Sequence, residues 1–194
     1  MQALSDDILW DSFRQGNKNA LAVLFERYYE VLFQYGIKVC RDTELVNDSL
    51  QDLFIEIWQQ RQPAPLISLQ AYLIKALRYK LIRAVKKDRS APLDPHYVPF
   101  EMSHEHFLIQ SEQDNANVEA LTQQLNQLSP RQREIIFLRF YQRLSYREIC
   151  DIMHIEYQVA RNQLSMALKK LRTLVKLSFQ WGNPFVCFEI FLFF

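Results

Sequence analysis

Apolar residues recur every three to four positions along most of the chain, which is the spacing of an amphipathic helix. In the first half the pattern predicts a short helix over residues 6–14 and three longer helices over residues 20–40, 43–61 and 69–88. Two prolines interrupt the chain between the last two of these helices. Helices of this kind bury a shared apolar seam, so we expect a compact helical bundle.

The helical pattern stops at residue 90 and does not resume until about residue 117. Pro92, Pro95 and Pro99 stand here among acidic residues, without any Lys or Arg. This composition predicts an extended acidic linker. The histidines of this segment are His96, His104 and His106. They have no further ligand at a suitable spacing, so no metal site is predicted.

A second helical block begins near Asn117. Ser129 with Gln132, and Ser145 with Glu148, have the spacing of a capping box, which marks the start of a helix. The helix after Ser145 is short and ends near residue 153. After a break at residues 154–156, a longer helix is predicted over residues 157–176. This order is the layout of a helix-turn-helix.

The last predicted helix has one apolar and one polar face. The polar face consists of Gln158, Arg161, Asn162, Ser165, Lys169 and Arg172. Arg pairs with guanine, Asn and Gln pair with adenine, and Ser and Lys reach phosphates. We therefore expect Gln158, Arg161 and Asn162 to contact bases, and Lys169 and Arg172 to contact phosphates. The alternative is a helical hairpin with a solvated polar face.

Two more helix faces have a distinct chemistry. Basic and aromatic residues gather on the helix over residues 69–88, which suits single-stranded or melted DNA. The candidate contacts there are Tyr72, Lys75, Arg78, Tyr79, Lys80, Arg83, Lys86 and Lys87. The outer face of the helix over residues 43–61 is acidic and polar, with Asp48, Gln51, Asp52 and Glu56. It would repel DNA but suits a basic protein surface. Either face is equally compatible with ordinary solvation.

Charge and composition narrow the class of protein. The 194 residues have a net charge of +1, but residues 91–130 carry −6 between segments of +2 and +5. Such asymmetry indicates a polyanionic partner. The three cysteines form no C-x-x-C motif, which indicates thiols in a reducing cytosol. No constellation of catalytic side chains is visible, so we expect neither an enzyme nor a cofactor.

Three segments in this order resemble the extracytoplasmic-function (ECF) sigma factors, RNA polymerase sigma factors of the sigma-70 family. The segments are Asp48-x-x-Gln51-Asp52-x-Phe54-x-x-x-Trp58, then Ala71-Tyr72-Leu73 with the basic helix, then Leu128-Ser129-Pro130-Arg131-Gln132-Arg133-Glu134 followed by Leu144-Ser145-Tyr146-Arg147-Glu148-Ile149. The resemblance implies an all-α fold of two small helical domains joined by the acidic linker. The expected divisions are residues 1–90, the linker 91–116, the helix-turn-helix domain 117–176 and an apolar tail 177–194.

The resemblance also implies the partners and the work of each domain. The first domain would bind bacterial core RNA polymerase through the acidic face, and would bind and open the promoter −10 element with the basic helix. The second would recognise the −35 element of promoter DNA, with Arg147 joining the contacts named above. Such factors act in the cytoplasm and are often inhibited by an anti-sigma factor, which this sequence does not identify.

Three departures from the family stand out. Tyr79 follows Arg78 where the family usually has Asn, and His154 stands in the turn where the family usually has glycine. His adopts the required left-handed conformation more readily than most residues. The Phe-rich segment 185–194 is too short to span a membrane, and we expect it to dock on the chain's own domains or on another protein. The alternative function is a stand-alone helix-turn-helix regulator that binds an operator as a dimer.

Overall fold

The computed structural model describes residues 5–60, 68–88, 99–102 and 122–179. Every regular element within these residues is a helix, which confirms the all-α prediction. The chain divides into two compact units, one built from Met1–His96 with Asp151–Met153 and the other from Tyr97–Cys150 and His154–Phe194. The Phe-rich tail and the three linker histidines lie outside the described residues.

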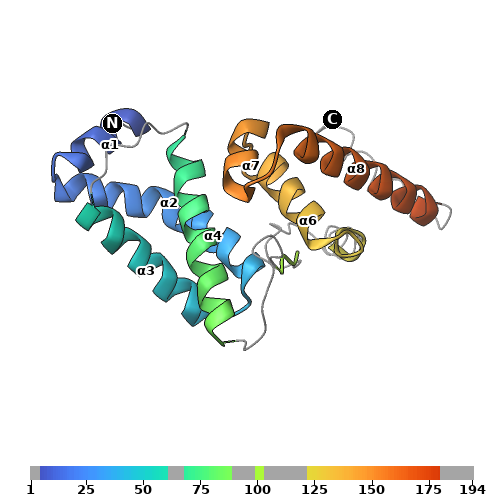
Figure 1. The fold of residues 1–194 in the computed structure, drawn as a ribbon, viewed down its shortest axis with the longest axis horizontal. Helices are drawn as coiled ribbons and strands as arrows, with labels where there is room; N and C mark the ends of the chain where they lie inside the picture. The colour runs from blue at the N-terminus through green and yellow to red at the C-terminus, as the bar shows by residue number, and fades with distance from the viewer. Residues whose placement is uncertain (1–4, 61–67, 89–98, 103–121, 180–194) are drawn as a thin grey trace. The chain divides into compact units, whose positions relative to one another are not determined.

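The first unit contains four helices close to the predicted positions: α1 (Asp6–Arg14), α2 (Lys18–Val39), α3 (Thr43–Gln60) and α4 (Leu69–Asp88). Helices α2, α3 and α4 pack against one another, and α1 packs against α2 (Figure 1). Fully buried leucines along the predicted stripes form the shared core. The apolar seam in the sequence is therefore the packing surface of the bundle.

Two local features set the geometry of this bundle. Asn17 caps α2, since its side chain accepts a hydrogen bond from the backbone N–H of Asn19 at 2.9 Å. At Gly36, a Cβ would lie only 2.7 Å from Cγ1 of Val46, so glycine permits the close approach of α2 and α3.

An aromatic cluster joins α1 to the start of α4. The ring centroids of Trp10 and Phe13 lie 4.8 Å apart, those of Phe13 and Trp58 5.7 Å, and those of Trp10 and Tyr72 5.8 Å. Both Trp10 and Phe13 are buried. Burying rings of this size stabilises the bundle, so this cluster helps to hold the short α1 in place.

The second unit contains α6 (Pro130–Ile136), α7 (Tyr146–Met153) and α8 (Tyr157–Phe179), with residues 122–126 also helical. Both predicted capping boxes are confirmed, at Ser129 and at Ser145. Helix α6 packs against α8. The helix-turn-helix predicted from the sequence is therefore present as α7, a tight turn and α8.

One element was not predicted. Helix α6 continues into a π-helix, η2 (Phe137–Tyr141), in which Gln142 N–H donates to the carbonyl of Phe137 at 3.1 Å. The chain then turns through Arg143, at φ 55°, before α7 begins. A π-helix is rare and is often found at functional sites. Here it lies directly before the turn that leads into α7.

Residues 99–102 of the predicted linker pack onto the second unit. Phe100 is fully buried, with its ring centroid 5.6 Å from that of Phe137, and Met102 is 2% exposed. Burying a side chain of this size contributes about 1.5–3 kcal/mol. Part of the segment that the sequence predicts as linker therefore belongs to the core of the second unit.

The turn between α7 and α8 depends on His154, which has φ 50° and ψ 53°. The left-handed conformation costs a non-glycine residue about 1–2 kcal/mol, whereas glycine adopts it freely but loses more entropy on folding, about 0.5–1 kcal/mol. The steric cost is the larger of the two.

We therefore expect His154→Gly to raise the free energy of unfolding by about 0.5–1 kcal/mol. His154→Val should lower it, because a β-branched side chain tolerates this conformation least. Thermal or urea unfolding of the full chain measures both changes. A glycine variant that is less stable than the native chain would contradict the strain at this turn.

Lys38, near the end of α2, is 5% exposed, and this burial lowers its pKa from 10.5 to about 8. Below pH 8 the lysine is protonated in both states, so folding bears the full cost of burying the charge. Between pH 8 and 10.5 the unfolded chain binds more protons than the folded chain, and stability rises with pH. Above this window the lysine is neutral in both states.

The rise should be on the order of 3 kcal/mol across this window. Urea unfolding of the native chain and of Lys38→Met at a series of pH values tests it. From pH 8 upward, the free energy of unfolding of the native chain should rise relative to that of Lys38→Met. A pH-independent difference would show that Lys38 keeps its ordinary pKa.

Candidate nucleic-acid interface

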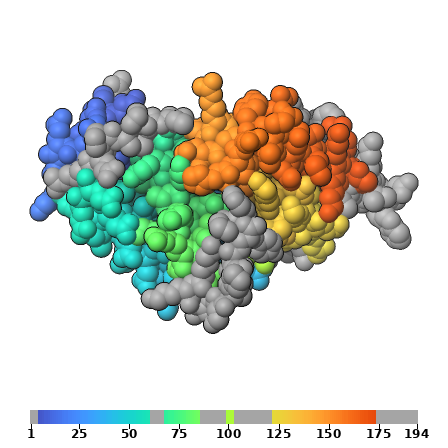
Figure 2. All heavy atoms as spheres, in the orientation of Figure 1, coloured from blue at the N-terminus to red at the C-terminus, as the bar shows by residue number. Residues whose placement is uncertain are grey.

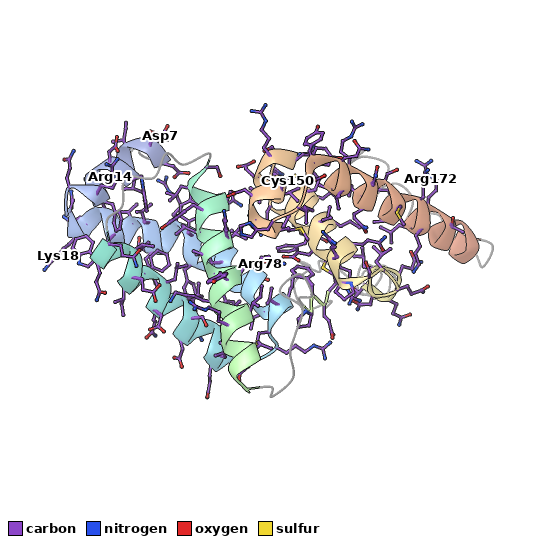
Figure 3. All side chains as sticks on the ribbon, in the orientation of Figure 1. Asp7, Arg14, Lys18, Arg78, Cys150 and Arg172 are labelled. Atoms are coloured by element: carbon purple, nitrogen blue, oxygen red, sulfur yellow. The ribbon has the colours of Figure 1, made fainter. Side chains whose placement is uncertain are left out.

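The polar face of α8 is exposed along its described length. The apolar side chains Ala160, Leu164, Ala167 and Leu171 are buried, each 7% exposed or less. The predicted contacts Gln158, Arg161, Asn162, Ser165, Lys169 and Arg172 are all exposed. Figure 2 shows the atoms of α8 at the surface of the second unit, and Figure 3 shows Arg172 pointing away from its helix. The structure thus brings these six predicted residues together on one face.

The same six residues line a single open groove, together with Tyr146, Leu164 and Leu168. Gln158 Nε2 donates to Asn162 Oδ1 at 3.0 Å, so the two amides that could recognise adenine are already aligned in the free chain. Arg147 is exposed on α7 but does not line the groove. Seven of the groove's side chains offer hydrogen-bond donors to a nucleic acid: Tyr146, Gln158, Arg161, Asn162, Ser165, Lys169 and Arg172.

Tyr146 was not predicted as a site residue, although it lies in the recognised motif. The Arg139 guanidinium lies over its ring, 5.3 Å from the centroid, and the ring of Tyr157 is 5.5 Å away. Arg139 also donates to the carbonyl of Leu144 at 2.8 Å, which fixes the chain just before α7. The position of Tyr146, directly after the capping Ser145, was the sequence signal that could have identified this residue.

The basic helix α4 presents a smaller exposed surface than its sequence suggests. Tyr79 is 59% exposed, and the guanidinium of Arg83 lies over its ring at 5.0 Å. Lys75 and Lys80 are half-buried. Arg78, labelled in Figure 3, is only 5% exposed. The side chains of Lys86 and Lys87 lie outside the described ones.

Tyr72 is also half-buried, against Trp10. Burial, with a smaller contribution from the charge of Glu56, raises the pKa of the Tyr72 hydroxyl. The ring therefore stays neutral and supports the start of α4. Of the aromatic residues predicted to meet DNA on this helix, Tyr79 is the one whose ring is mainly in solvent.

The four predicted polar residues of α3 all face solvent: Asp48, Gln51, Asp52 and Glu56. Ile55, which is 53% exposed, lies on the same face. Ile55 was not among the predicted contacts, although it lies three residues after Asp52 and hence on the same side of the helix. An exposed apolar residue among carboxylates suits a protein surface better than DNA.

The acidic face of α3 and the basic face of α4 share one ion pair. Glu56 Oε1 accepts from Lys80 Nζ, and both residues were predicted to bind a partner. Exposed pairs of this kind contribute about 0–1 kcal/mol. Each side chain thus restrains the other, and breaking the pair changes the stability of the fold little.

Among the described residues no group of His, Cys, Asp and Glu side chains is arranged to hold a metal ion. No described helix has the length and apolar character needed to cross a membrane.

Comparison with family models matches both units. Residues 24–91 match the model described as Sigma-70 region 2, and residues 118–171 match Sigma-70, region 4. Together the two matches cover more than half of the chain. The chain belongs to the sigma-70 family. As a sigma factor it directs RNA polymerase to promoters, and it has promoter DNA and the polymerase as its partners.

Solved structures show the same fold. CnrH, in complex with the cytosolic domain of CnrY, aligns with a TM-score of 0.59 at 21% identity, over 89% of this chain and 97% of CnrH. The sigma factor RpoE from Bartonella quintana, in complex with the anti-sigma factor NepR, aligns with a TM-score of 0.55 at 20% identity, over 80% and 96%. No curated protein matches the sequence. The predicted membership of the sigma-70 family is therefore confirmed by the family models, and these structures confirm the fold.

For this sigma factor the matched regions coincide with the three faces described above. Region 2 contains the acidic face of α3 and the exposed part of α4, and region 4 contains every residue of the groove on α8 except Arg172. The individual contact residues remain predictions.

Proposed function

We propose that this sigma factor recognises the −35 element with α8, engages the −10 element with α4 and binds core RNA polymerase with α3. The observation that supports it best is the groove on α8, because six of the seven residues predicted to contact the −35 element line it, Arg147 being the exception. In this proposal the chain acts by binding alone, in the cytoplasm, where the polymerase works.

The proposed −35 contact places α8 in the major groove, which is wide enough to admit one helix. Arg161 and Asn162 lie in the first two turns of α8, the part of a recognition helix that usually reaches base edges. Lys169 and Arg172 lie farther along and reach phosphates, which fix orientation without reading sequence. Tyr146 adds an aromatic edge to the same groove.

The proposed −10 contact rests on Tyr79 and Arg83. An exposed ring with a guanidinium above it offers a stacking surface for an unpaired base, beside a charge for the adjacent phosphate. Arg78 would need to leave its buried position in order to touch DNA. Tyr79 therefore takes the place that the family usually gives to Asn.

The proposed polymerase contact is the outer face of α3. Its carboxylates at Asp48 and Asp52 attract a basic surface, and exposed Ile55 supplies an apolar centre. The acidic linker, residues 91–116 in this proposal, would pass through the polymerase along a path that otherwise receives nucleic acid. Its excess of negative charge supports that role.

An inhibitor is a further proposed partner. Both aligned structures contain a sigma factor bound to a second protein, and for RpoE that protein is an anti-sigma factor. By this likeness we propose that an anti-sigma factor binds the present chain.

One experiment separates this proposal from a stand-alone regulator. The purified chain is mixed with bacterial core polymerase and a library of promoter fragments. Initiation that depends on both elements, with weak binding of DNA by the chain alone, supports the proposal. Tight binding to a two-fold symmetric operator without polymerase would overturn it.

We expect Arg161→Ala to weaken binding to the −35 element by about 1–3 kcal/mol and to relax selection at one base position. Initiation that depends on the −35 element should fall accordingly. Arg172→Ala is the matched control on the same groove. Arg172→Ala should weaken binding to all DNA sequences alike. The salt dependence of binding should fall by the equivalent of about one phosphate contact. Competition binding of the holoenzyme to promoter variants at several salt concentrations measures both. Unchanged base selection in Arg161→Ala would remove that residue from the recognition surface.

Reversing a charge on α3 should weaken the polymerase complex. We expect Asp52→Lys to raise the dissociation constant for core polymerase at least tenfold, because it places a cation against a basic partner. Glu26→Lys, an exposed acid of α2 away from this face, is the control and should bind as the native chain does. Fluorescence anisotropy at low and physiological salt measures both. Equal losses in the two variants would indicate a general charge effect and not a specific surface.

A further inference from the structure

The second unit holds a short piece of the linker in a built site, here named the linker anchor (residues 100–102; light green in Figure 1). Phe100 and Met102 are buried, while Glu101 between them is half-buried. This alternation is typical of an extended peptide that inserts every second side chain. The ring of Phe100 packs against Phe137 of the π-helix.

Asn126 binds both main-chain polar groups of Met102 in the anchor. Its Oδ1 accepts from the N–H of Met102 at 3.2 Å, and its Nδ2 donates to the carbonyl of Met102 at 2.9 Å. Two hydrogen bonds to one residue resemble those that a neighbouring strand would make. Within the anchor the amide contacts backbone atoms only, so it does not select the sequence, and selectivity comes from the two apolar side chains.

Arg133 fixes the orientation of this amide. Its NH1 donates to the carbonyl of Asn126 at 2.8 Å and to Asn126 Oδ1 at 3.3 Å. Because Oδ1 already faces a cation, Nδ2 must be the atom that meets the carbonyl of Met102. Arg133 thus positions Asn126, and α6 supplies a rigid base for the site.

The anchor shortens the stretch of chain between the end of α4 and the first point at which the chain is fixed on the second unit. Helix α4 ends at Asp88, so only ten residues, 89–98, separate it from the segment that begins at Pro99. Ten residues span at most about 35 Å. Without the anchor the chain from 89 to 121 is 33 residues long and could span about 115 Å. The anchor therefore limits how far the linker can reach.

We propose that this site is a peptide-binding groove whose occupant in the free sigma factor is its own linker, and that it empties when the linker enters RNA polymerase. This rests on the proposed path of the linker. The groove accepts an extended peptide with apolar residues at alternate positions. Burial of two side chains is opposed by the entropy lost in ordering the segment, so the anchor opens at a small free-energy cost.

Two measurements on the full chain test the proposal. Hydrogen exchange at the Met102 amide, followed by NMR, reports whether the anchor is closed. Binding of core polymerase reports whether opening precedes complex formation. We expect slow exchange in the native chain and fast exchange in Phe100→Ala. If the anchor is closed in about 90% of free molecules, Phe100→Ala should bind polymerase about tenfold more tightly.

Two further variants control this experiment. Glu156→Gln, at an exposed acid of the second unit outside the anchor, should match the native chain in both measurements. Asn126→Asp keeps the acceptor but removes the donor to the Met102 carbonyl, so it should speed exchange and tighten polymerase binding without removing an apolar side chain. Circular dichroism melting checks that each variant is folded.

Fast exchange at Met102 in the native chain would overturn the anchor itself. Fast exchange in Phe100→Ala and Asn126→Asp with unchanged polymerase affinity would overturn its release. A native chain that fails to bind polymerase would instead overturn the proposed function and, with it, the release step, whereas slow exchange at Met102 would still establish the occupied groove.

Discussion

Burial of one apolar stripe on each helix determines which residues of this protein face a partner. On α8, Ala160 and Ala167 are fully buried, which fixes the rotation of the helix about its axis. Once that rotation is fixed, the helical period of 3.6 places Arg161 and Lys169 on the opposite side. The same argument holds for α3, where burial of Leu50 turns Asp52 outward. Each functional surface is thus a consequence of core packing.

The helix-turn-helix depends on more than its stripes. Two non-glycine residues, Arg143 and His154, adopt positive φ at the two ends of α7. A capping box holds the start of α7, and Arg139 donates to the carbonyl of Leu144 just before it. These polar contacts compensate locally for the conformational cost of the turns. The short α7 is therefore fixed in position despite having only two turns.

The helices were predictable because their signals are local. Periodicity and capping boxes gave α3, α4 and the starts of α6 and α7 to within about a residue, and the αL conformation of His154 followed from its position in the turn. The exposed face of α8 followed from the same period.

What the sequence did not predict depends on contacts between distant segments. The burial of Arg78 and the pairing of Glu56 with Lys80 require the packing of α4 against its neighbours. The burial of Phe100 requires the π-helix at Phe137, which no local pattern indicated. Proline and acidic residues around Phe100 are typical of linkers, and composition alone gives no sign of a site 26 residues away in Asn126.

The pairing of Glu56 with Lys80 links the two surfaces for which we propose different partners. Glu56 lies on the acidic face of α3 and Lys80 on the basic face of α4, so a partner that recruits one of them competes with the other. The pair is partly exposed and contributes little to stability, which means that competition costs the fold almost nothing. A basic protein surface at Glu56 would leave Lys80 available for a phosphate, and a phosphate at Lys80 would leave Glu56 available for that protein surface. Because such coupling is reciprocal, polymerase and DNA bound as proposed would each favour binding of the other through this pair, by no more than the small energy of the pair itself.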